Sequence, residues 1–417
     1  MSFYRSVIQG LALTVCLVGS AVANAPMVSE RPVARPGSTP PPSLERIIET
    51  TRFDGDLGVA LVDVATGTII EARNAEQAFA PASVTKAITA MYALDKLGEN
   101  FRFVTTVGMV GTQQGAVLDG DLVLIGTGDP TLDTDDLIGL ADQIKAAGIT
   151  SVTGRLSYYD GALPRLREID DQQPSYVGYN PAISGLNLNY NRVYFEWKRQ
   201  GSGFETSVDA RSDIMRPKVS MARVGISDRA GPVFTYENRD GVDAWNVRQS
   251  ALGNGGGRWL PVRDAGRYTA DVFVQVLRAR GVSVSRTDRI AQIPPVYILA
   301  KHDSAPVVSL VQDMLKYSTN LTAEVLGLRS SLQERQVESL AASAALMQDW
   351  SAQRLGMQAA RFVDHSGLGD QTRVSPLDMV RALRAKHLND PRFVDVLKPI
   401  PVRDAKGTVQ GAVEYSI

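Results

Sequence analysis

One helix of this chain is apolar on almost every side, so it can fold only inside a larger core. It is expected to begin at residues 83–86 and to end at Gly98. Its apolar members cover most of the helical circumference: Ala87, Ile88, Ala90, Met91, Ala93, Leu94 and Leu97. Because no polar face is left for water, other elements must surround this helix. A chain of 417 residues, 44% of them hydrophobic, can supply such a core and about two or three domains.

Ser83 and Lys86 stand one helical turn apart where this helix begins. Residues three apart share a helix face, so the lysine amine can reach the serine hydroxyl. If burial lowers the pKa of the amine, it can take the hydroxyl proton as a base, without a histidine. The alternative is an ordinary serine and lysine on a first turn, since Ser-x-x-Lys occurs by chance about once in a chain of this size.

A second candidate motif lies at residues 318–320. One helix is expected to end near Lys316 and another to begin at Leu321, which leaves Ser318 and Asn320 on the turn between them. Both side chains can then point into one cleft, where the hydroxyl relays a proton and the amide holds a substrate carbonyl. The alternative is helix capping, which serine and asparagine favour and which position alone supports better.

Together the two motifs resemble those of β-lactamases and penicillin-binding proteins. The long stretch between Ser83 and Ser318 is similar to the low-molecular-mass class C penicillin-binding proteins, the D-alanyl-D-alanine carboxypeptidase/endopeptidase family, whereas β-lactamases place the motifs much closer. Further matching stretches are residues 120–132, 320–324 and 364–368. The resemblance covers nearly the whole chain after its first residues.

The resemblance implies an α/β fold, with a penicillin-binding-protein/β-lactamase-like transpeptidase domain that is split in sequence. Its two parts are expected at residues 44–102 and 300–417, and the mostly-β material at residues 103–299 is read as one or more inserted domains. Local patterns predict strands at 58–64, 68–72, 120–126, 186–190 and 193–197, a turn at 253–257, and helices around 270–277 and across 306–332.

By the same resemblance Ser83 is the acylated nucleophile, Lys86 its proton acceptor, and Ser318 and Asn320 the second active-site motif. The implied reaction is attack on the carbonyl of a D-Ala-D-Ala or cross-link peptide in peptidoglycan, followed by hydrolysis of the acyl-enzyme. Peptidoglycan peptides and β-lactams are the expected partners. The resemblance implies no metal and no organic cofactor.

The third motif of this family, Lys-Thr-Gly, does not occur in these 417 residues. The nearest string is Lys406-Gly407-Thr408, inside a stretch at 399–408 that resembles the segment before the Lys-Thr-Gly strand. Lys406 is therefore not assigned to catalysis, and the chain is expected to stop early, as a fragment or truncated form of an enzyme. The alternatives are a non-catalytic peptidoglycan-binding protein on the same fold and a β-lactamase, which the long insertion disfavours.

Other candidate sites are weaker. Residues 126–131 follow a strand as a dinucleotide loop does, but Pro130 lacks an N–H and Thr131 replaces a glycine, which favours a structural turn. The three histidines are isolated from any paired-ligand spacing, so zinc is not expected. Asp364-His365-Ser366 suggests a triad, yet adjacent residues rarely converge on one another, which favours turn residues near the cleft.

The first residues predict an export signal, and the protein is expected to be secreted to the periplasm. Arg5, an apolar run at 7–22 and small residues up to Ala23 indicate a signal peptide at 1–23, followed by a proline-rich linker at 24–43. The alternative, a membrane anchor, needs a longer run of ~20 residues. Cys16 is the single cysteine, so the mature chain has no disulfide.

The net charge of −1 and the absence of a Lys/Arg-rich run disfavour a nucleic-acid partner. The sequence leaves the oligomeric state open.

Overall fold

A computed structural model describes residues 43–51, 54–403 and 408–416 of this chain. The predicted signal peptide, all but one residue of the predicted linker, and Lys406 lie outside the described residues. The chain divides into two compact units, residues 1–55 and 56–417. In the first unit the described part is mainly one helix, α1 (Leu44–Thr51).

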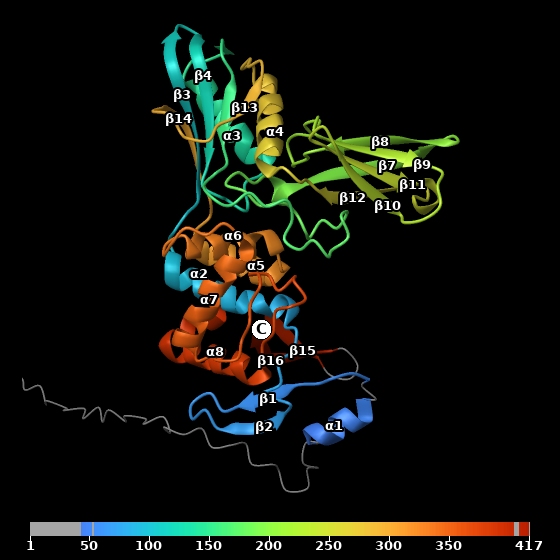
Figure 1. Cartoon of the computed structure of the whole chain (residues 1–417), viewed down its shortest axis with the longest axis vertical. Helices are drawn as coiled ribbons and strands as arrows, with labels where there is room; N and C mark the ends of the chain where they lie inside the picture. Colours follow the sequence, from blue (N-terminus) through green and yellow to red (C-terminus); the bar gives the residue numbers. More distant parts are fainter. Residues whose placement is uncertain (1–42, 52–53, 404–407, 417) are drawn as a thin grey trace, which may run out of the picture. The chain divides into compact units, whose positions relative to one another are not determined.

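The apolar helix predicted from the sequence is enclosed by other helices. It consists of a short 3-10 turn, η1 (Ala82–Val84), and α2 (Thr85–Leu97), and Gly98 ends it with a φ of +81°. The helices that contact α2 are α5 (Val307–Tyr317), α6 (Asn320–Ser331) and α7 (Leu340–Leu355) (Figure 1). Every residue from Thr85 to Ala93 is buried, so the predicted burial of this helix is confirmed.

The other elements outside the insertion are a further helix, a 3-10 segment and two pairs of strands. They are α8 (Pro376–Asn389), the 3-10 segment η4 (Pro391–Val396), and the antiparallel pairs β1 (Val59–Val62) with β2 (Ile69–Arg73) and β15 (Pro399–Arg403) with β16 (Val409–Ser416). The β1–β2 hairpin confirms the predicted strand, turn and returning strand. α8 contacts β1, and the guanidinium of Arg384 donates to the carbonyl oxygen of Val64 at 2.8 Å.

The long insertion between the two motifs has a hydrophobic core of its own. It begins with a six-stranded sheet of β3 (Val104–Gln114), β4 (Val117–Gly126), β5 (Ser151–Val152), β6 (Leu156–Tyr159), β13 (Thr287–Arg289) and β14 (Tyr297–Asp303). Two helices, α3 (Thr134–Ala146) and α4 (Ala265–Ala279), contact each other and this sheet. The core joins Leu124, Leu140 and Phe273.

The insertion begins and ends on neighbouring strands. Val104, at the start of β3, pairs with Asp303, at the end of β14. Because the chain leaves and re-enters the helical part at one place, the helical core can form around a long insertion. The sheet runs to Asp303, a little beyond the predicted boundary at residue 299.

Two further three-stranded sheets complete the insertion. One has the order β12-β7-β8, from β7 (Arg192–Gln200), β8 (Gly203–Asp209) and β12 (Gly255–Pro261). The other has the order β10-β11-β9, from β9 (Ala222–Ser227), β10 (Phe234–Arg239) and β11 (Val242–Arg248) (Figure 1). The predicted strands at 120–126 and 193–197 lie within β4 and β7, and the predicted helix at 270–277 lies within α4.

The predicted strand at 186–190 is wrong. Residues 189–191 form the 3-10 turn η2 (Asn189–Asn191), with left-handed φ values between 51° and 55°. The amide of Asn191 replaces strand pairing, since its oxygen accepts from Leu188 N at 2.9 Å and its nitrogen donates to the Ala182 carbonyl at 2.8 Å. Asparagine tolerates the left-handed region and bonds to nearby backbone, which overrides the alternating pattern.

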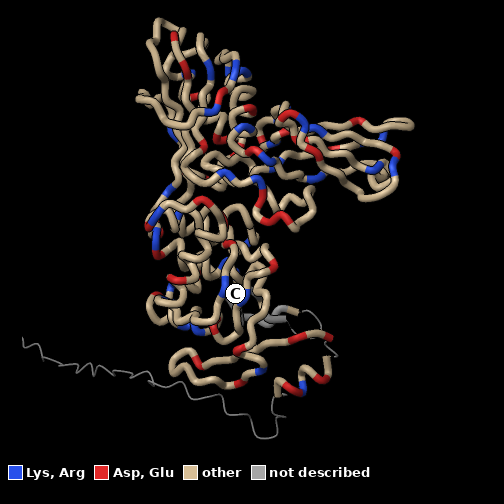
Figure 2. Tube along the Cα trace, viewed as in Figure 1, with Lys and Arg blue, Asp and Glu red and all other residues tan. Residues whose placement is uncertain are grey.

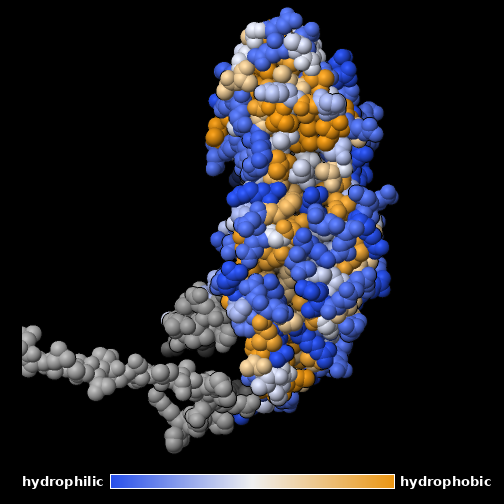
Figure 3. All heavy atoms as spheres, turned by 90° about the vertical axis from the view of Figure 1, so that its left-hand side faces the viewer, coloured by the Kyte–Doolittle hydropathy of each residue, from blue (hydrophilic) through white to orange (hydrophobic). Residues whose placement is uncertain are grey.

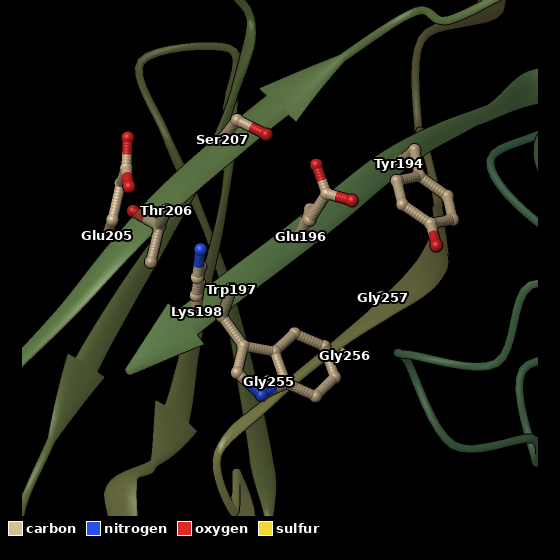
Figure 4. A pocket seen from close by; sticks show the side chains of 10 residues that line it. All are labelled: Tyr194, Glu196, Trp197, Lys198, Glu205, Thr206, Ser207, Gly255, Gly256 and Gly257. Carbon is tan, nitrogen blue, oxygen red and sulfur yellow. The ribbon is translucent and has the colours of Figure 1, made fainter. Parts of the chain in front are cut away.

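The predicted turn at 253–257 is wrong in its second half, because Gly255 to Gly257 open strand β12. A Cβ atom on Gly257 would overlap the hydroxyl of Tyr194, and one on Gly256 would overlap the ring of Trp197. Figure 4 shows both rings beside this strand. Glycine is needed here because aromatic side chains of β7 cover the backbone of β12.

Charged and apolar side chains are mixed over the surface. Figure 2 shows Lys and Arg interspersed with Asp and Glu along the described chain.

Apolar side chains gather near the top of Figure 3, on the side where β3 and β14 lie, and Val110, Tyr297 and Ile298 are among the exposed ones. Among the helices in the described part of the chain, none has the length and apolar content to cross a membrane.

Candidate active site

Ser83 and Lys86 meet at the start of α2. The Nζ atom of Lys86 donates to the Oγ atom of Ser83 at 3.1 Å. Ser83 is exposed, whereas Lys86 is only 1% exposed. An accessible hydroxyl therefore lies directly over a buried amine, which is the arrangement that a serine nucleophile and its base require.

A second hydrogen bond holds the Lys86 amine from below. Its Nζ atom donates to the carbonyl oxygen of Ser366 at 2.9 Å. A neutral amine can keep this donated bond while its lone pair faces the Ser83 hydroxyl. The two contacts together fix where the amine lies.

Burial lowers the pKa of Lys86 to about 8, and the negative charges of Glu324 and Asp364 act in the opposite direction. Roughly a tenth of the amine is then neutral at pH 7, compared with less than about one part in a thousand for an ordinary lysine. The buried amine can therefore act as a base near neutral pH.

The Ser366 carbonyl belongs to a tight turn that packs against the start of α2. Asp364 closes this turn by accepting from Gly367 N at 2.7 Å and from Gly369 N at 2.6 Å. Gly367 has a φ of +74°, and a Cβ atom there would overlap the carbonyl oxygen of Ala82. The missing side chain thus allows the close approach that brings Ser366 to Lys86.

The His365 ring faces away from Asp364 and from Ser83. Its Nε2 atom shares a hydrogen bond of 2.7 Å with the Ser343 hydroxyl, and burial lowers its pKa to about 3. The ring lies against Gly327 of α6, where a Cβ atom would overlap it. Asp364-His365-Ser366 is therefore a turn near the candidate site, as predicted, and not a catalytic triad.

Glu324 is the site residue that sequence analysis missed. Its side chain is fully buried, and its two oxygens accept from His365 N at 3.0 Å and from Ser366 N at 2.8 Å. Burial raises the pKa of this carboxyl, and the neighbouring Asp364 raises it further. The available signal in the sequence was a single acidic residue within an otherwise uncharged, largely apolar stretch at 321–328.

Ser318 and Asn320 lie on the predicted turn between α5 and α6. Ser318 is exposed and ends α5 with a left-handed φ of 57°, and Asn320 is the first residue of α6. The Nδ2 atom of Asn320 donates to the carbonyl oxygen of Tyr179 in the insertion at 2.9 Å. Neither side chain makes an N-cap hydrogen bond to α6, because Thr319 is the N-cap residue.

The hydrogen bonds of the described residues do not join the two motifs directly. They connect through α6: Glu324, one turn after Asn320, binds the same turn that receives Lys86. The structure thus brings Ser83 and Lys86 into contact and ties Asn320 to the insertion.

Comparison with known proteins decides the family. The sequence model of the D-Ala-D-Ala carboxypeptidase 3 (S13) family matches residues 42–416. The chain belongs to this family. This S13 family member is 27% identical over 353 residues to a D-alanyl-D-alanine carboxypeptidase of Actinomadura sp. (strain R39), and the match covers 79% of the chain and 61% of that relative. It is 24% identical to D-alanyl-D-alanine carboxypeptidase DacB of Haemophilus influenzae, over 85% of the chain and 76% of that relative.

A solved structure shares the fold. The S13 family member superposes on penicillin binding protein 4 from Haemophilus influenzae with a TM-score of 0.69 at 23% identity, over 85% of this chain and 80% of that one. A second structure of that protein, in complex with a β-lactam, gives a TM-score of 0.67. The predicted fold class, an α/β transpeptidase-like domain carrying inserted β material, is confirmed.

The S13 family member has one hollow beside the turn that holds Lys86 and another on a sheet of the insertion. One, of about 780 Å³, reaches the Asp364 turn, and its lining includes Glu168, Asp170, Arg361 and Asp370. The other, of about 680 Å³, lies on the β12-β7-β8 sheet and is lined by Tyr194, Trp197 and neighbours (Figure 4). None of the four predicted site residues lines either hollow.

Residues 126–131 of the S13 family member form a closed turn. Asp129 accepts from Thr131 N at 2.8 Å, and Gly128 has a φ of +107°. Across the described ranges, no group of three or more His, Cys, Asp or Glu side chains is arranged to hold a metal ion.

Proposed function

We propose that this chain is a serine-type D-Ala-D-Ala carboxypeptidase/endopeptidase that acts on peptidoglycan stem peptides in the periplasm. The contact between the exposed Ser83 hydroxyl and the buried Lys86 amine carries the proposal. Membership of the S13 family and the names of the relatives support the substrate class. The catalytic domain comprises residues 44–102 and 300–417, and residues 1–23 direct export.

The reaction proceeds through an acyl-enzyme. The Ser83 proton passes to Lys86 Nζ while Oγ forms a bond to the carbonyl carbon of the penultimate D-alanine. The C–N bond then breaks, the terminal D-alanine leaves as its amine with the proton from Lys86, and water hydrolyses the ester. A positioned base such as Lys86 contributes a factor of ~10² to 10⁴ to the rate.

Ser318 and Asn320 complete the site in this proposal. The Ser318 hydroxyl is exposed and has no hydrogen-bond partner within the described part of the protein, so it is available to relay the proton to the leaving amine. Asn320 uses one amide hydrogen on the Tyr179 carbonyl and keeps the other for a substrate carbonyl.

A labelled penicillin tests the proposal. The β-lactam carbonyl replaces the peptide carbonyl, and opening of its ring leaves a covalent adduct on the nucleophile. We expect the full chain to be labelled, mass spectrometry to find the adduct on Ser83, and Ser83→Ala to abolish it. A wild-type protein that takes no label and releases no D-alanine from a D-Ala-D-Ala peptide would refute the proposal.

A second candidate is a non-catalytic peptidoglycan-binding protein on the same fold, because no Lys-Thr-Gly string occurs in residues 1–417 and the nearest string is Lys406-Gly407-Thr408. This candidate predicts that Ser83→Ala and wild type bind muropeptides equally and that neither cleaves them. Rapid turnover of nitrocefin would instead point to a β-lactamase.

A further inference from the structure

Glu324 connects two backbone groups to the base of the proposed reaction. One carboxyl oxygen accepts the N–H of His365 and the other that of Ser366. The carbonyl oxygen of Ser366 in turn accepts from Lys86 Nζ. A side chain on α6 therefore binds the peptide unit next to the one whose carbonyl holds the amine on α2.

A carboxylate at this place is costly, because the Glu324 side chain is fully buried. Within the described residues no Lys, Arg or His forms a salt bridge with it, and the Lys86 ammonium is the cation whose field it modifies. A neutral side chain could satisfy a backbone N–H without that cost. Burial and Asp364 raise the pKa of this carboxyl, whereas the two backbone N–H bonds that it accepts favour its charged form. In that form Glu324 acts on Lys86 as well as on the turn.

The proposed reaction creates a positive charge on Lys86. As the Ser83 proton arrives, the amine becomes an ammonium, and a fixed negative charge nearby stabilises that change. Glu324 and Asp364 are the carboxyls that act on Lys86, and both raise its pKa. Asp170 in the insertion acts on Asp364, while the His365 ring is turned toward Ser343 and has a pKa of about 3, so it stays neutral.

We propose that Glu324 is a positioning residue for the Ser83–Lys86 pair: its carboxylate aligns the Ser366 carbonyl with the Lys86 amine and favours the ammonium that forms during acylation. The inference rests on the proposed function, because it assigns a role within that reaction. It concerns a residue that neither sequence motif contains.

The pH profile of acylation by a labelled penicillin tests this role. In Glu324→Gln the shape is kept and the charge removed, so Lys86 should lose its proton more readily. The midpoint of the acid limb should move down by about one pH unit, and the plateau rate should fall about tenfold or more. In Glu324→Asp the charge stays but recedes by one methylene, so the midpoint should stay while the plateau falls.

Ser343→Ala is the matched control. It removes the partner of the His365 ring in the same turn but no charge, so a purely structural disturbance would lower the rate without moving the midpoint. An unchanged midpoint in Glu324→Gln would overturn the charge role. If that variant does not fold, a wild-type plateau in Glu324→Asp would overturn the alignment role. Failure of the wild type to label would instead refute the proposed function.

Discussion

The Nζ atom of Lys86 lies 3.1 Å from the Oγ atom of Ser83, and the same Nζ atom donates to the Ser366 carbonyl at 2.9 Å. Serine and lysine alone would leave the amine free to turn toward water. The Ser366 carbonyl, presented by a turn 280 positions away in the sequence, keeps it beneath the hydroxyl. The candidate site therefore depends on packing between distant segments.

Replacement of the base should slow acylation strongly and leave the fold intact. In Lys86→Met the methionine fills most of the buried space but cannot accept a proton, so penicillin labelling should slow by ~10²- to 10⁴-fold. Lys96→Met is the control, because Lys96 lies near the other end of α2 and pairs with Glu334. Equal labelling of Lys86→Met and wild type would contradict the assignment of the base.

Acylation of the wild type should depend on pH through Lys86. Its pKa is lowered to about 8, and only the neutral amine accepts the Ser83 proton. The rate should therefore rise as pH increases from 6 to about 9, with a midpoint near pH 8, and level off above it. Stopped-flow or quenched labelling at each pH measures the profile. A rate that is flat over this range would exclude Lys86 as the titrating base.

Gly367→Ala should disrupt the turn beneath Lys86. The new methyl group would overlap the Ala82 carbonyl, and the residue has a φ of +74°. We expect a loss of about 3 kcal/mol or more in unfolding free energy, together with slower labelling. Gly356→Ala shares a left-handed φ, of +72°, but meets nothing within 4 Å, so it should cost only about 1–2 kcal/mol. Denaturant unfolding measures the loss of unfolding free energy in both variants. Equal losses would show that the close approach of residue 367 to the Ala82 carbonyl is unimportant for stability.

Burial of His365 should make the protein sensitive to acid. Its pKa is about 3 in the folded state, compared with 6.5 for an ordinary histidine in the unfolded chain, so between these pH values the unfolded chain binds one more proton. The contribution of His365 to folding stability should therefore decrease as pH falls from 6.5 toward 3, by about 1.4 kcal/mol per pH unit. Glu324 and Asp364, whose pKa values are raised, act in the opposite direction.

A variant isolates the contribution of His365. Glu324 and Asp364 are present in both wild type and His365→Gln, so their effects cancel in the difference between the two unfolding free energies. The difference in unfolding free energy between wild type and His365→Gln should shrink by about 1.4 kcal/mol for each pH unit below 6.5. A difference that is independent of pH would show that His365 is protonated in the folded protein.

Patterns confined to one segment were predictable. The burial of α2 follows from its apolar circumference, and the contact between Ser83 and Lys86 follows from helix geometry. The break between α5 and α6 was also predicted, because helical patterning stops and restarts there. The error at 186–190 arose where asparagine side chains replaced strand pairing with local hydrogen bonds.

The order of residues along the chain was enough to identify the family and to predict Ser83 and Lys86 as a nucleophile and its base, because both inferences rest on short motifs whose spacing is set by local geometry. Glu324, Gly367 and the Ser366 carbonyl acquire their roles only when α6 and the 364–369 turn pack against α2. Burial then lowers the pKa of Lys86 and raises that of Glu324. These pKa shifts exist only in the folded protein, because desolvation of Lys86 and Glu324 depends on which distant segments pack around them and exclude water.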